Sequence, residues 1–380
     1  MQTVIFVSPH SDLYGAERSL ISIMLYARKS GYNPVLLIKK SGPIESKLQE
    51  EKIEYYMVPF RQCINTKGKH DSLRGFKDYI RDRQTLERFI SQHKKLCDET
   101  VLVHTNSIIS WFGVMLSQAL HVPHIQHIRE FGKEDFDMAF NFSNKLTARI
   151  FNKSSRIVCI SDAVLNTYKN MFNPAKMVRI YNGVGHSTVL ERRRSSSDKI
   201  NILLVGRLSK EKGQREAIAA CEKLIERGIF NFELHLYGNG VDEKALREYV
   251  SNKGLEQNVV FKGYSTQINY SDYDIALMTS KAEAFGRVTV EYMLNGLPVV
   301  GVATGGTTEI VIEKHTGLLS ECGNIGQLAS NIELLILNED YRKELGHNGK
   351  LRANDFFTEE AYGKNIMSLY SEVLESHNEG

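Results

Sequence analysis

The sequence lacks the features that mark several large classes of protein. Its five cysteines are scattered and form no CxxC pair, so we expect reduced thiols in the cytosol rather than a disulfide framework. No apolar run approaches the ~20 residues that a helix needs to span a bilayer. The first ten residues have no basic segment and no small-residue cleavage site, so they are expected to form a strand rather than a signal peptide.

Two families of catalytic motif are also missing. The sequence contains no HExxH pattern and no Cys/His cluster, and the three histidines of residues 121–127 alternate with apolar residues as on a strand, so no metal site is expected. The first strand-to-helix turn, residues 8–17, does not fit GxGxxG. That absence counts against an oxidoreductase that uses a dinucleotide cofactor.

The composition is that of an ordinary globular protein, but the charge is distributed unevenly along the chain. The chain has 380 residues, 42% hydrophobic and 24% charged, which is enough for two domains. Residues 1–195 hold 29 Lys and Arg against 18 Asp and Glu, a net +11, whereas residues 196–380 hold 19 against 27, a net −8. Such asymmetry suggests that the first half faces an anionic membrane surface, a phosphate-bearing acceptor or nucleic acid. Aromatic residues do not interleave with the basic clusters, so nucleic acid is the least favoured of the three.

Short β-branched runs alternate with amphipathic helical patterns along most of the chain, which predicts an α/β fold with doubly wound parallel sheets. The predicted strands are Val4–Ser8, Val35–Ile38, Tyr55–Val58, Val101–His104, His124–Ile128, Ile157–Ile160, Val178–Tyr181, Ile202–Val205, Glu233–Tyr237, Val259–Phe261, Ile275–Met278 and Val299–Val302. A polar stretch interrupts the pattern near residue 195. We therefore predict two Rossmann-like domains, residues 1–183 and 200–355, joined by a linker at 184–199, with a ligand cleft at facing strand ends.

The most informative segment runs from Glu283 to Glu291 and reads E-A-F-G-R-V-T-V-E. It joins the predicted strand Ile275–Met278 to a helix that ends before Gly296. Gly286 and the residues after it are expected to present the N–H groups of a helix N-terminus, which attract phosphate. Glu283 and Glu291 would then reach the hydroxyls of a sugar and a ribose on either side of a diphosphate. The alternative is two solvated glutamates with accidental spacing.

Four further segments supply candidate groups. Residues 205–213 place Gly206, Arg207, Lys212 and Gly213 after a strand, where two cations suit a diphosphate and the charge that grows on a leaving phosphate. Gly15 lies at the start of the first helix, and its backbone could approach phosphates closely. The other candidates for contacting a sugar or an acceptor lie at strand ends; they are His104, His127, Arg129, Glu130, Thr304, Gly305 and Gly306. Ordinary β-α turns with exposed charges explain each segment nearly as well.

Together these segments resemble the retaining family 4 glycosyltransferases of the GT-B fold, also described as glycosyl transferases group 1. The residues that carry the resemblance are Glu283–Glu291 with its Phe-Gly, Gly206-Arg207 with Lys212-Gly213, Thr304-Gly305-Gly306 followed by Glu309-Ile310-Val311, and Tyr181-Asn182-Gly183-Val184. The likeness covers essentially the whole chain and is strongest from Ile202 to Leu319. It implies two Rossmann-like domains that face each other across a cleft, with a C-terminal helix, here Thr358–Leu374 within 358–380, that crosses back to the N-terminal domain.

The resemblance also implies roles for particular residues. Glu283 would contact the donor sugar, Glu291 would bind the ribose, and Gly15 would sit under the phosphates. Arg207 and Lys212 would neutralise the diphosphate and assist its departure. Sugar and phosphate would be held by the backbone amides of Phe285, Gly286, Arg287 and Val288. This chain departs from many relatives, since it has Tyr14-Gly15 in place of a double glycine and Thr307-Thr308 in place of a proline-containing pattern. Either His127 or Arg129 would face the donor sugar.

The resemblance implies a hexosyl- or N-acetylhexosaminyl-type transferase that uses a UDP- or GDP-sugar as donor, with no other cofactor, no essential metal and no covalent carboxylate intermediate. The expected acceptor is a lipid-linked saccharide in bacterial cell-surface polysaccharide or lipopolysaccharide synthesis. The enzyme would be cytoplasmic, with peripheral contact to the inner face of the membrane through its basic N-terminal domain. The alternatives are a non-catalytic nucleotide-sugar-binding subunit, a GT-B nucleotide-sugar epimerase, and an acceptor that is a soluble polysaccharide, a protein or a small molecule.

Overall fold

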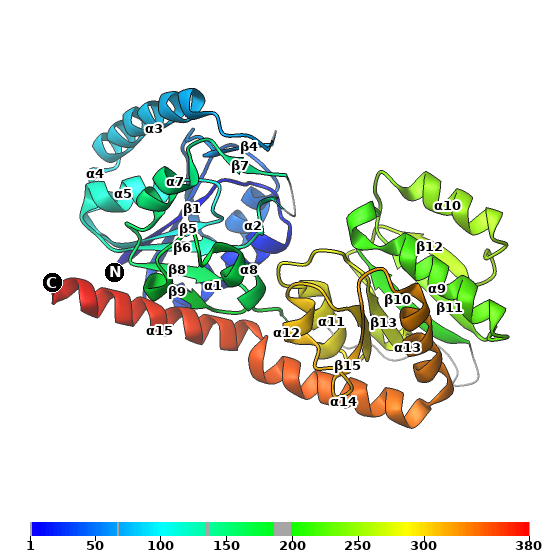
Figure 1. The fold of residues 1–380 in the computed structure, drawn as a ribbon. Coiled ribbons are helices and arrows are strands. Elements are labelled where there is room, and N and C mark those ends of the chain that lie inside the picture. The colour runs from blue at the N-terminus through cyan, green and yellow to red at the C-terminus, as the bar shows by residue number, and fades with distance from the viewer. Residues whose placement is uncertain (1, 67, 134–136, 186–198, 380) are drawn as a thin grey trace. The chain divides into compact units, whose positions relative to one another are not determined.

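The computed structural model describes residues 2–66, 68–133, 137–185 and 199–379 (Figure 1). These residues form two compact units, one of Met1–Gly183 with Glu359–Gly380 and the other of Val184–Thr358. Most of the predicted linker, residues 186–198, lies outside the described residues. The backbone N–H of Val184 donates to the carbonyl of Phe357 at 2.8 Å. The chain passes between the units next to these two residues, at Gly183–Val184 and at Thr358–Glu359, so the two connecting segments lie side by side.

The first unit is built on a parallel seven-stranded sheet in the order β3-β2-β1-β5-β6-β8-β9. The strands are β1 Thr3–Ser8, β2 Asn33–Ile38, β3 Glu54–Met57, β5 Thr100–Asn106, β6 His124–Ile128, β8 Arg156–Cys159 and β9 Met177–Arg179. Every residue of β1 is buried, as expected for the centre of a parallel sheet covered on both faces. A two-stranded antiparallel sheet of β4 Ile64–Asn65 and β7 Ala139–Phe140, which the sequence did not predict, completes this unit.

Helices cover the first sheet. The longer ones are amphipathic; for example, Leu20, Ile23 and Met24 of α1 Gly15–Lys29 are buried in the core together with Tyr362, Ile366 and Tyr370 of α15 Glu359–Asn378. The C-terminal helix therefore belongs to the N-terminal unit, as predicted. The other helices of this unit are α2 Ile44–Glu50, α3 Ser72–Gln92, α4 Lys94–Asp98, α5 Phe112–Leu120, α7 Asn144–Phe151, α8 Asp162–Tyr168 and η1 Pro174–Lys176.

The second unit is a parallel six-stranded sheet in the order β12-β11-β10-β13-β14-β15. The strands are β10 Ile200–Val205, β11 Phe232–Tyr237, β12 Val259–Gly263, β13 Ile275–Met278, β14 Val299–Val302 and β15 Gly317–Ser320, of which only β15 was not predicted. The helices are η2 Lys210–Lys212, α9 Gln214–Glu226, α10 Glu243–Asn252, η3 Tyr270–Asp272, α11 Arg287–Leu294, α12 Thr307–Ile310, α13 Ile325–Leu337 and α14 Glu339–Phe356.

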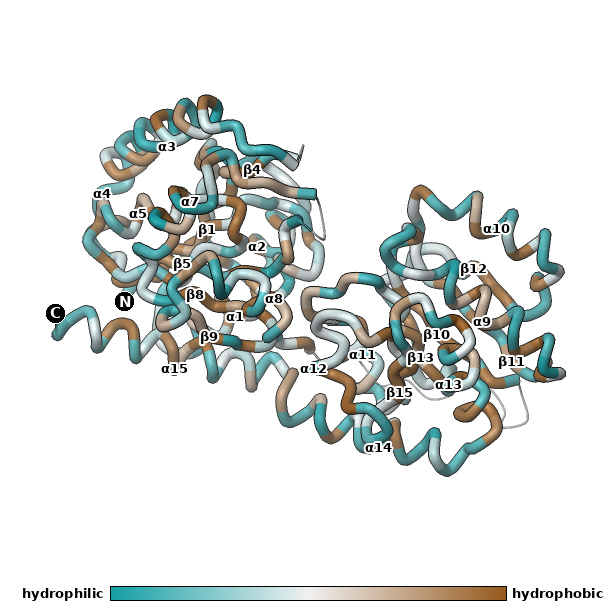
Figure 2. Tube along the Cα trace, viewed as in Figure 1, coloured by the Kyte–Doolittle hydropathy of each residue, from teal (hydrophilic) through white to brown (hydrophobic). Residues whose placement is uncertain are grey.

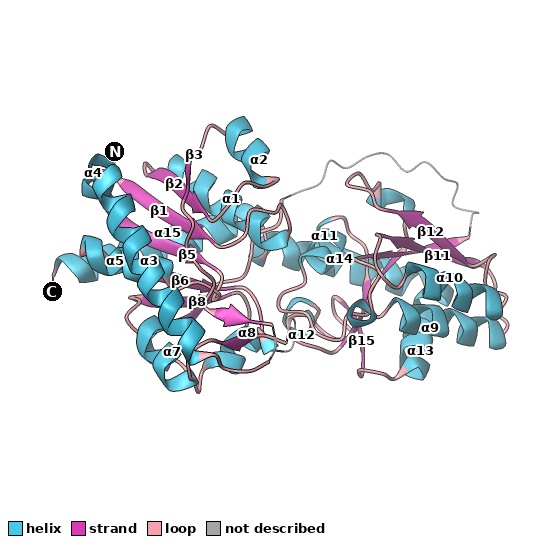
Figure 3. Ribbon diagram, turned by 90° about the horizontal axis from the view of Figure 1, so that it is seen from above, coloured by secondary structure: helices cyan, strands magenta, loops and turns pink. Residues whose placement is uncertain are grey.

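Helix α9 packs its apolar face in the core. Ala217, Ile218, Cys221 and Leu224 are all buried there, next to strand residues such as Leu234. Figure 2 shows the same pattern throughout, with hydrophobic residues gathered on the strands and on the inner faces of helices. Figure 3 shows the strands of each unit lying between helices. Within the described ranges, no helix is both long and apolar enough to cross a bilayer.

Candidate functional site

The predicted site residues of the second unit gather at the carboxyl edge of its sheet. Lys212 ends η2, directly after β10, and its Nζ lies 2.8 Å from Oε2 of Glu283, which follows β13. The loop that carries Lys212 is fixed by the hydroxyl of Thr279, which donates to the Lys212 carbonyl at 2.9 Å. Gly213 has a φ of +70°, and a Cβ there would lie 2.1 Å from the Thr279 carbonyl oxygen, so only glycine fits this turn.

A second loop packs against the Glu283 segment from the neighbouring strand β14. The backbone N–H of Gly306 donates to the Glu283 carbonyl at 2.7 Å, and the hydroxyl of Thr304 donates to the Ser280 carbonyl at 2.9 Å. A Cβ at Gly306 would lie 2.6 Å from the carbonyl oxygen of Phe285. The structure thus brings the predicted residues Thr304–Gly306 into direct contact with the predicted Glu283–Gly286 loop.

Helix α11 begins at this loop. Its N-cap is Gly286, with a φ of +101°, and glycine has no side chain that could satisfy the first-turn amides. Phe285, just before it, is buried with its ring centroid 6.0 Å from that of Phe357. The hydroxyl of Thr289, in the first turn, is buried and has no hydrogen-bond partner within the part of the chain that is described. The helix start therefore combines amide donors with an unsatisfied hydroxyl, a combination suited to an anionic ligand.

Glu291 is held by a residue that the sequence analysis missed. The hydroxyl of Tyr270, in η3, donates to Oε2 of Glu291 at 3.2 Å. The ring of Tyr270 lies edge-on to the buried ring of Tyr292, with 6.3 Å between their centroids, and the Tyr292 hydroxyl accepts from the Val205 N–H at 2.7 Å. These contacts fix the start of the β10 loop and the carboxylate of Glu291 relative to each other.

Gly206 and Arg207 directly follow β10, next to the end of the neighbouring strand β11. The N–H of Gly206 donates to the carbonyl of Tyr237 at 2.9 Å. The carbonyl of Arg207 accepts from the side-chain amide of Gln214 at 2.9 Å, while the Arg207 side chain is exposed and makes no hydrogen bond or ion pair with the described residues. The Arg207 guanidinium is therefore exposed, and its predicted role toward a diphosphate stays a prediction.

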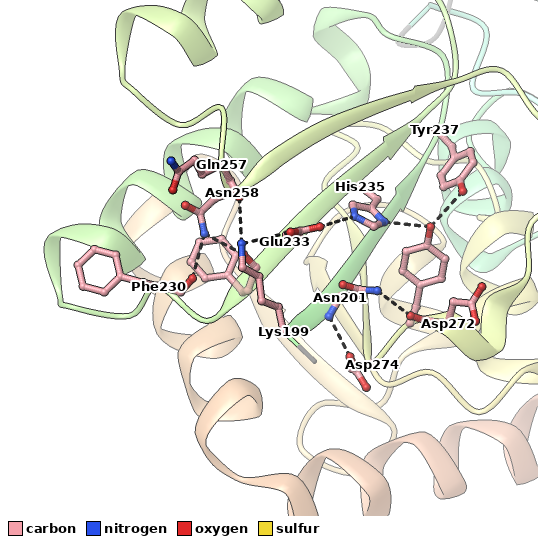
Figure 4. Close-up of polar contacts among 12 residues, drawn as sticks. Lys199, Asn201, Phe230, Glu233, His235, Tyr237, Gln257, Asn258, Asp272 and Asp274 are labelled. Atoms are coloured by element: carbon pink, nitrogen blue, oxygen red, sulfur yellow. Dashed lines mark hydrogen bonds and ion pairs between the residues drawn. The ribbon is translucent and has the colours of Figure 1, made fainter. Parts of the chain in front are cut away.

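Figure 4 shows a chain of polar contacts along β11 that the sequence pattern did not predict. Lys199 lies 3.2 Å from Glu233, which contacts His235 at 3.1 Å. His235 in turn lies 3.2 Å from the hydroxyl of Tyr273, which is 3.1 Å from that of Tyr237. Residues 233, 235 and 237 share one face of β11. The spacing of Glu, His and Tyr at every second position was therefore the sequence feature that could have predicted a row of polar contacts on this strand.

The predicted candidates of the first unit form a buried polar cluster at the ends of β5 and β6. Nε2 of His104 lies 3.1 Å from Nδ1 of His127, and Nδ1 of His104 lies 2.7 Å from the hydroxyl of Tyr370 on α15. Burial lowers the pKa of both histidines well below its ordinary value, so both rings are neutral at pH 7. Nε2 of His127 is buried and has no hydrogen-bond partner among the described residues.

Arg129 is engaged on all sides inside the same cluster. Its guanidinium donates to Oδ1 of Asn106, to Oδ1 of Asn182 at 2.6 Å and to the hydroxyl of Tyr362 at 3.0 Å. The side chain is only 6% exposed, so these neutral oxygens replace the water that a buried guanidinium loses. The sequence pattern predicted Arg129 but not Tyr362, which lies 233 residues away in the chain.

Glu130 is turned into the fold rather than outward. One of its oxygens accepts from Ile108 N–H at 2.9 Å and from the Ser107 hydroxyl, and the other accepts from Arg129 N–H at 3.1 Å. Burial raises the pKa of this carboxyl, although these donors oppose the shift. Gly15 is the first residue of α1, and Glu17, two residues later, is buried with its pKa raised by desolvation.

A cavity of about 730 Å³ opens beside this cluster within the first unit. Its wall is formed by residues that follow β5 and β6, such as Ile108 and Phe131, and by Tyr168, whose hydroxyl donates to the Phe131 carbonyl at 3.2 Å. The lining is mainly apolar, with His70, Lys133 and Lys145 as its basic members. Open parallel sheets bind ligands beyond the carboxyl ends of their strands, so the cavity is placed to receive a substrate.

Two family models together match most of the chain. The family described as glycosyl transferases group 1 matches residues 188–352, and the one described as glycosyltransferase family 4 matches residues 14–187. An uncharacterized glycosyltransferase of Methanocaldococcus jannaschii is 30% identical over 271 residues, which are 69% of this chain and 72% of that protein. The chain belongs to the family 4 glycosyltransferases.

Other relatives of this glycosyltransferase are more distant. The poly(ribitol-phosphate) alpha-N-acetylglucosaminyltransferase of Staphylococcus aureus is 24% identical over 67% of this chain and 51% of its own length. The crystal structure of Anabaena HepE in complex with UDP has a TM-score of 0.79 at 21% identity, and covers 98% of this chain and all of that one. HepE in complex with UDP-glucose gives 0.75 with the same identity and coverage. These likenesses confirm the predicted GT-B fold.

Proposed function

We propose that this glycosyltransferase transfers a hexosyl or N-acetylhexosaminyl group, with retention of configuration, from a UDP-sugar to a hydroxyl of a lipid-linked saccharide in the assembly of a bacterial cell-surface polysaccharide. The observation that carries the proposal is the Lys212–Glu283 contact beside the N-terminus of α11, with Glu291 held by Tyr270. The UDP and UDP-glucose complexes of HepE support a uridine donor, and the Staphylococcus aureus relative supports a cell-surface acceptor.

Each group then has a chemical role. The amides at the start of α11, at Phe285, Gly286, Arg287 and Val288, and the cations of Arg207 and Lys212 bind the diphosphate and stabilise the charge that develops as it leaves. Glu283 orients the sugar hydroxyls and Glu291 orients the ribose, since each carboxylate oxygen accepts a hydrogen bond. Gly206, and Gly305 with its neighbours in the Thr304–Gly306 loop, allow the chain to approach the donor closely.

As the first-unit contact to the donor sugar, His127 is favoured over Arg129. The reason is hydrogen-bond capacity: Nε2 of His127 has no partner among the described residues, whereas three oxygens already hold the Arg129 guanidinium. Gly15 keeps its predicted role of approaching the phosphates through its backbone. His104 and Glu130 hold in place the end of β6, which carries His127 and is followed by Arg129. The 730 Å³ cavity receives the acceptor.

The transfer proceeds by attack of the acceptor hydroxyl on the anomeric carbon from the side of the leaving diphosphate. The C–O bond to the phosphate breaks, and a phosphate oxygen takes the hydroxyl proton. The chain stabilises an oxocarbenium-like transition state through the groups that hold the diphosphate and the sugar.

A donor screen tests the proposal. The purified protein is incubated with UDP-glucose, UDP-galactose, UDP-N-acetylglucosamine or GDP-mannose and a bacterial lipid extract, and released UDP or GDP is measured. We expect acceptor-dependent UDP release and a product whose anomeric configuration, read by NMR, matches the donor. A product with the opposite anomeric configuration would overturn the retaining mechanism. Release of GDP but not UDP would overturn the uridine donor. Conversion of the donor sugar in the absence of acceptor would favour the epimerase alternative. UDP release with a soluble acceptor but not with the lipid extract would overturn the proposal of a lipid-linked acceptor.

A further inference from the structure

A groove of about 590 Å³ lies at the carboxyl edge of the first sheet, beside the start of α3. Lys39, which directly follows β2, lines this groove, and so does Arg61, which lies shortly after β3. Lys77 reaches the groove from α3. Three cations from three separate elements therefore converge on one space, at the edge where open parallel sheets bind ligands.

These three cations are not neutralised by ion pairs. In the parts of the chain that the structure describes, the side chains of Lys39, Arg61 and Lys77 make no hydrogen bond or ion pair. Burial lowers the pKa of Lys39, and the nearby Arg61 and Lys40 lower it further, while two buried acids of α3 oppose the shift. Positive charge is thus crowded at this edge of the sheet, which favours an anionic ligand.

The acids that line the groove leave it with a net positive charge. The charged residues of the lining are Lys39, Arg61, Arg74, Lys77 and Arg81 against Asp71 and Asp78, a net charge of +3. Asp78 is buried, and Arg74 and Arg81 lie 3.5 and 3.8 Å from it, so these three residues together carry a net charge of +1. Asp71 is the N-cap of α3, and its carboxylate accepts from the N–H of Arg74 at 3.0 Å.

A buried acid fixes the loop that carries Arg61. Asp82 accepts from the backbone N–H of Arg61 at 2.8 Å and from the indole N–H of Trp111 at 2.7 Å. Burial raises the pKa of Asp82 to about 7, so at neutral pH this acid cancels only part of a positive charge. The third acid of α3, the exposed Glu87, pairs with Arg83 at 3.3 Å, and neither residue lines the groove. The groove therefore presents cations on a fixed framework.

The groove adjoins the cavity of about 730 Å³ that the proposed function gives to the acceptor. Gln62 lines the groove, and Ile64, two residues further along the chain, lines the cavity. His70 lines the cavity, and the next residue, Asp71, lines the groove. The segment that carries β4 therefore borders both spaces, and both lie within the first unit (Figure 1). A chain-like ligand with one end in the cavity would continue past β4 into the groove.

We infer that the groove binds the negatively charged repeating units of an extended acceptor, a saccharide or polyol chain that carries phosphate or carboxylate groups. The reacting end of this acceptor would lie in the cavity. The negative groups behind it would accept charge-assisted hydrogen bonds from Lys39, Arg61 and Lys77. Cations that line a concave space from three elements suit a narrow chain better than a flat surface. The inference rests on the proposed transferase function and narrows its acceptor to an anionic chain.

Fluorescence anisotropy of the full chain with labelled, lipid-free oligomers tests the inference at physiological salt. The probes are an oligomer of glycerol phosphate, an oligomer of galacturonate, a neutral dextran of the same length and a single-stranded DNA oligonucleotide of the same charge. The groove variant is Lys39→Gln with Arg61→Gln and Lys77→Gln. A second variant carries only Arg61→Gln and Lys77→Gln, the changes at the two fully exposed positions.

The control variant removes the same amount of positive charge from the same unit. It is Lys52→Gln with Lys94→Gln and Arg149→Gln, three exposed cations that line neither the groove nor the cavity. A loss of binding that depends only on the net charge of the unit would be equal in the control and groove variants.

We expect the wild type to bind an anionic oligomer and not the dextran. The groove variant should bind that oligomer about thirtyfold more weakly and the second variant about tenfold, since each exposed charge-assisted contact is worth roughly threefold. The control should bind like the wild type. Preference for glycerol phosphate or for galacturonate would support the groove and identify its negative group. Dextran or DNA that binds as tightly as the anionic oligomers, or equal losses in the groove and control variants, would overturn the inference.

UDP release by the wild type, measured alongside, separates a failure of this inference from a failure of the proposed function. Wild type that binds an anionic oligomer in the groove but transfers no sugar would contradict the proposed function and not the groove. Wild type that transfers sugar but binds neither anionic oligomer would overturn the groove and not the proposed function. A circular dichroism spectrum identical to that of the wild type shows that each variant is folded.

Discussion

The Nζ atom of Lys212 lies 2.8 Å from Oε2 of Glu283, although 71 residues separate the two in sequence. The contact exists because β10 and β13 are neighbouring parallel strands, so the loops that follow them leave the same edge of the sheet. The Lys212 side chain is 36% exposed and that of Glu283 is 18% exposed. The pair is thus accessible to a ligand, and its cation and carboxylate suit the two ends of a sugar diphosphate.

The first prediction concerns Lys212. We expect Lys212→Gln to lower kcat by tenfold to a hundredfold, because a cation that stabilises the leaving diphosphate is lost. The free energy of unfolding should change by less than ~1 kcal/mol, since a partly exposed ion pair contributes little. The matched control is Lys281→Gln, since Lys281 pairs with Glu216 at 2.7 Å with a similar exposure of 40%. Equal losses of kcat in the two variants would contradict the role of Lys212.

The second prediction concerns Arg207. Arg207→Ala should lower kcat by about 10²–10³, or ~3–4 kcal/mol of transition-state stabilisation, as is typical when one donor to a developing oxyanion is removed. The variant should fold normally, because the side chain is exposed. Steady-state UDP release measures the effect, and Lys210→Ala, an exposed cation three residues away, provides the comparison. A near wild-type rate would remove Arg207 from the mechanism.

The third prediction concerns the close approach of two loops. In Gly306→Ala the new Cβ would lie 2.6 Å from the Phe285 carbonyl oxygen and 2.7 Å from the Phe285 Cα. The Glu283 loop must shift, so we expect donor affinity, measured by calorimetry with UDP, to fall at least tenfold and stability to fall by about 1–3 kcal/mol. Gly326→Ala, where the nearest atom is 3.6 Å away, should change neither quantity appreciably. Unchanged UDP binding in Gly306→Ala would show that the loops do not form the donor site.

The fourth prediction concerns the C-terminal helix. Tyr362→Phe removes the hydroxyl that accepts from the buried Arg129 guanidinium at 3.0 Å. We expect a loss of about 1–3 kcal/mol, the cost of leaving a buried charged donor without its partner. Urea unfolding followed by fluorescence measures it, because the single tryptophan, Trp111, is buried in the same unit. Tyr26→Phe, whose exposed hydroxyl donates to Glu360, should lose under ~0.5 kcal/mol. Similar losses in both variants would refute a special role for Tyr362.

The fifth prediction concerns pH. Burial lowers the pKa of His124 to about 3, against an ordinary value of 6.5, and lowers those of His104 and His127 as well. Below pH 6.5 the unfolded chain binds protons that the folded chain does not, so stability present at pH 7.5 is lost as the pH falls. Each histidine contributes about 1.4 kcal/mol between pH 7.5 and 5.5.

In His124→Gln, the loss of unfolding free energy between pH 7.5 and 5.5 should be smaller than in the wild type by the contribution of one histidine. The urea midpoint at the two pH values, followed through Trp111, measures it. The difference between the two wild-type midpoints is the reference for this comparison. A wild-type midpoint that rises on acidification would show that the three rings are not buried in their neutral forms.

Local pattern predicted most of the fold. His124–Ile128, Ile275–Met278 and Val299–Val302 are strands with the predicted bounds, because buried parallel strands are short apolar runs that their own residues specify. The C-terminal helix, which the family resemblance implied, is present as Glu359–Asn378. The strand Gly317–Ser320 was missed because it begins with glycine and has no β-branched residue, unlike the predicted strands of the same length. The strands β4 and β7 were missed because each has only two residues and they pair across some 70 positions.

The sequence by itself determined where strand, loop and helix follow one another, with glycines at the turns, and from that order it predicted which loops carry the chemistry. It placed Lys212 after one strand and Glu283 after another. Only the tertiary structure decided that these two side chains touch, that Tyr270 and Tyr362 complete the surroundings of Glu291 and Arg129, and that Lys39, Arg61 and Lys77 line one groove. Periodicity is a local property of the chain, whereas side-chain partners hundreds of residues apart are chosen by strand order and packing.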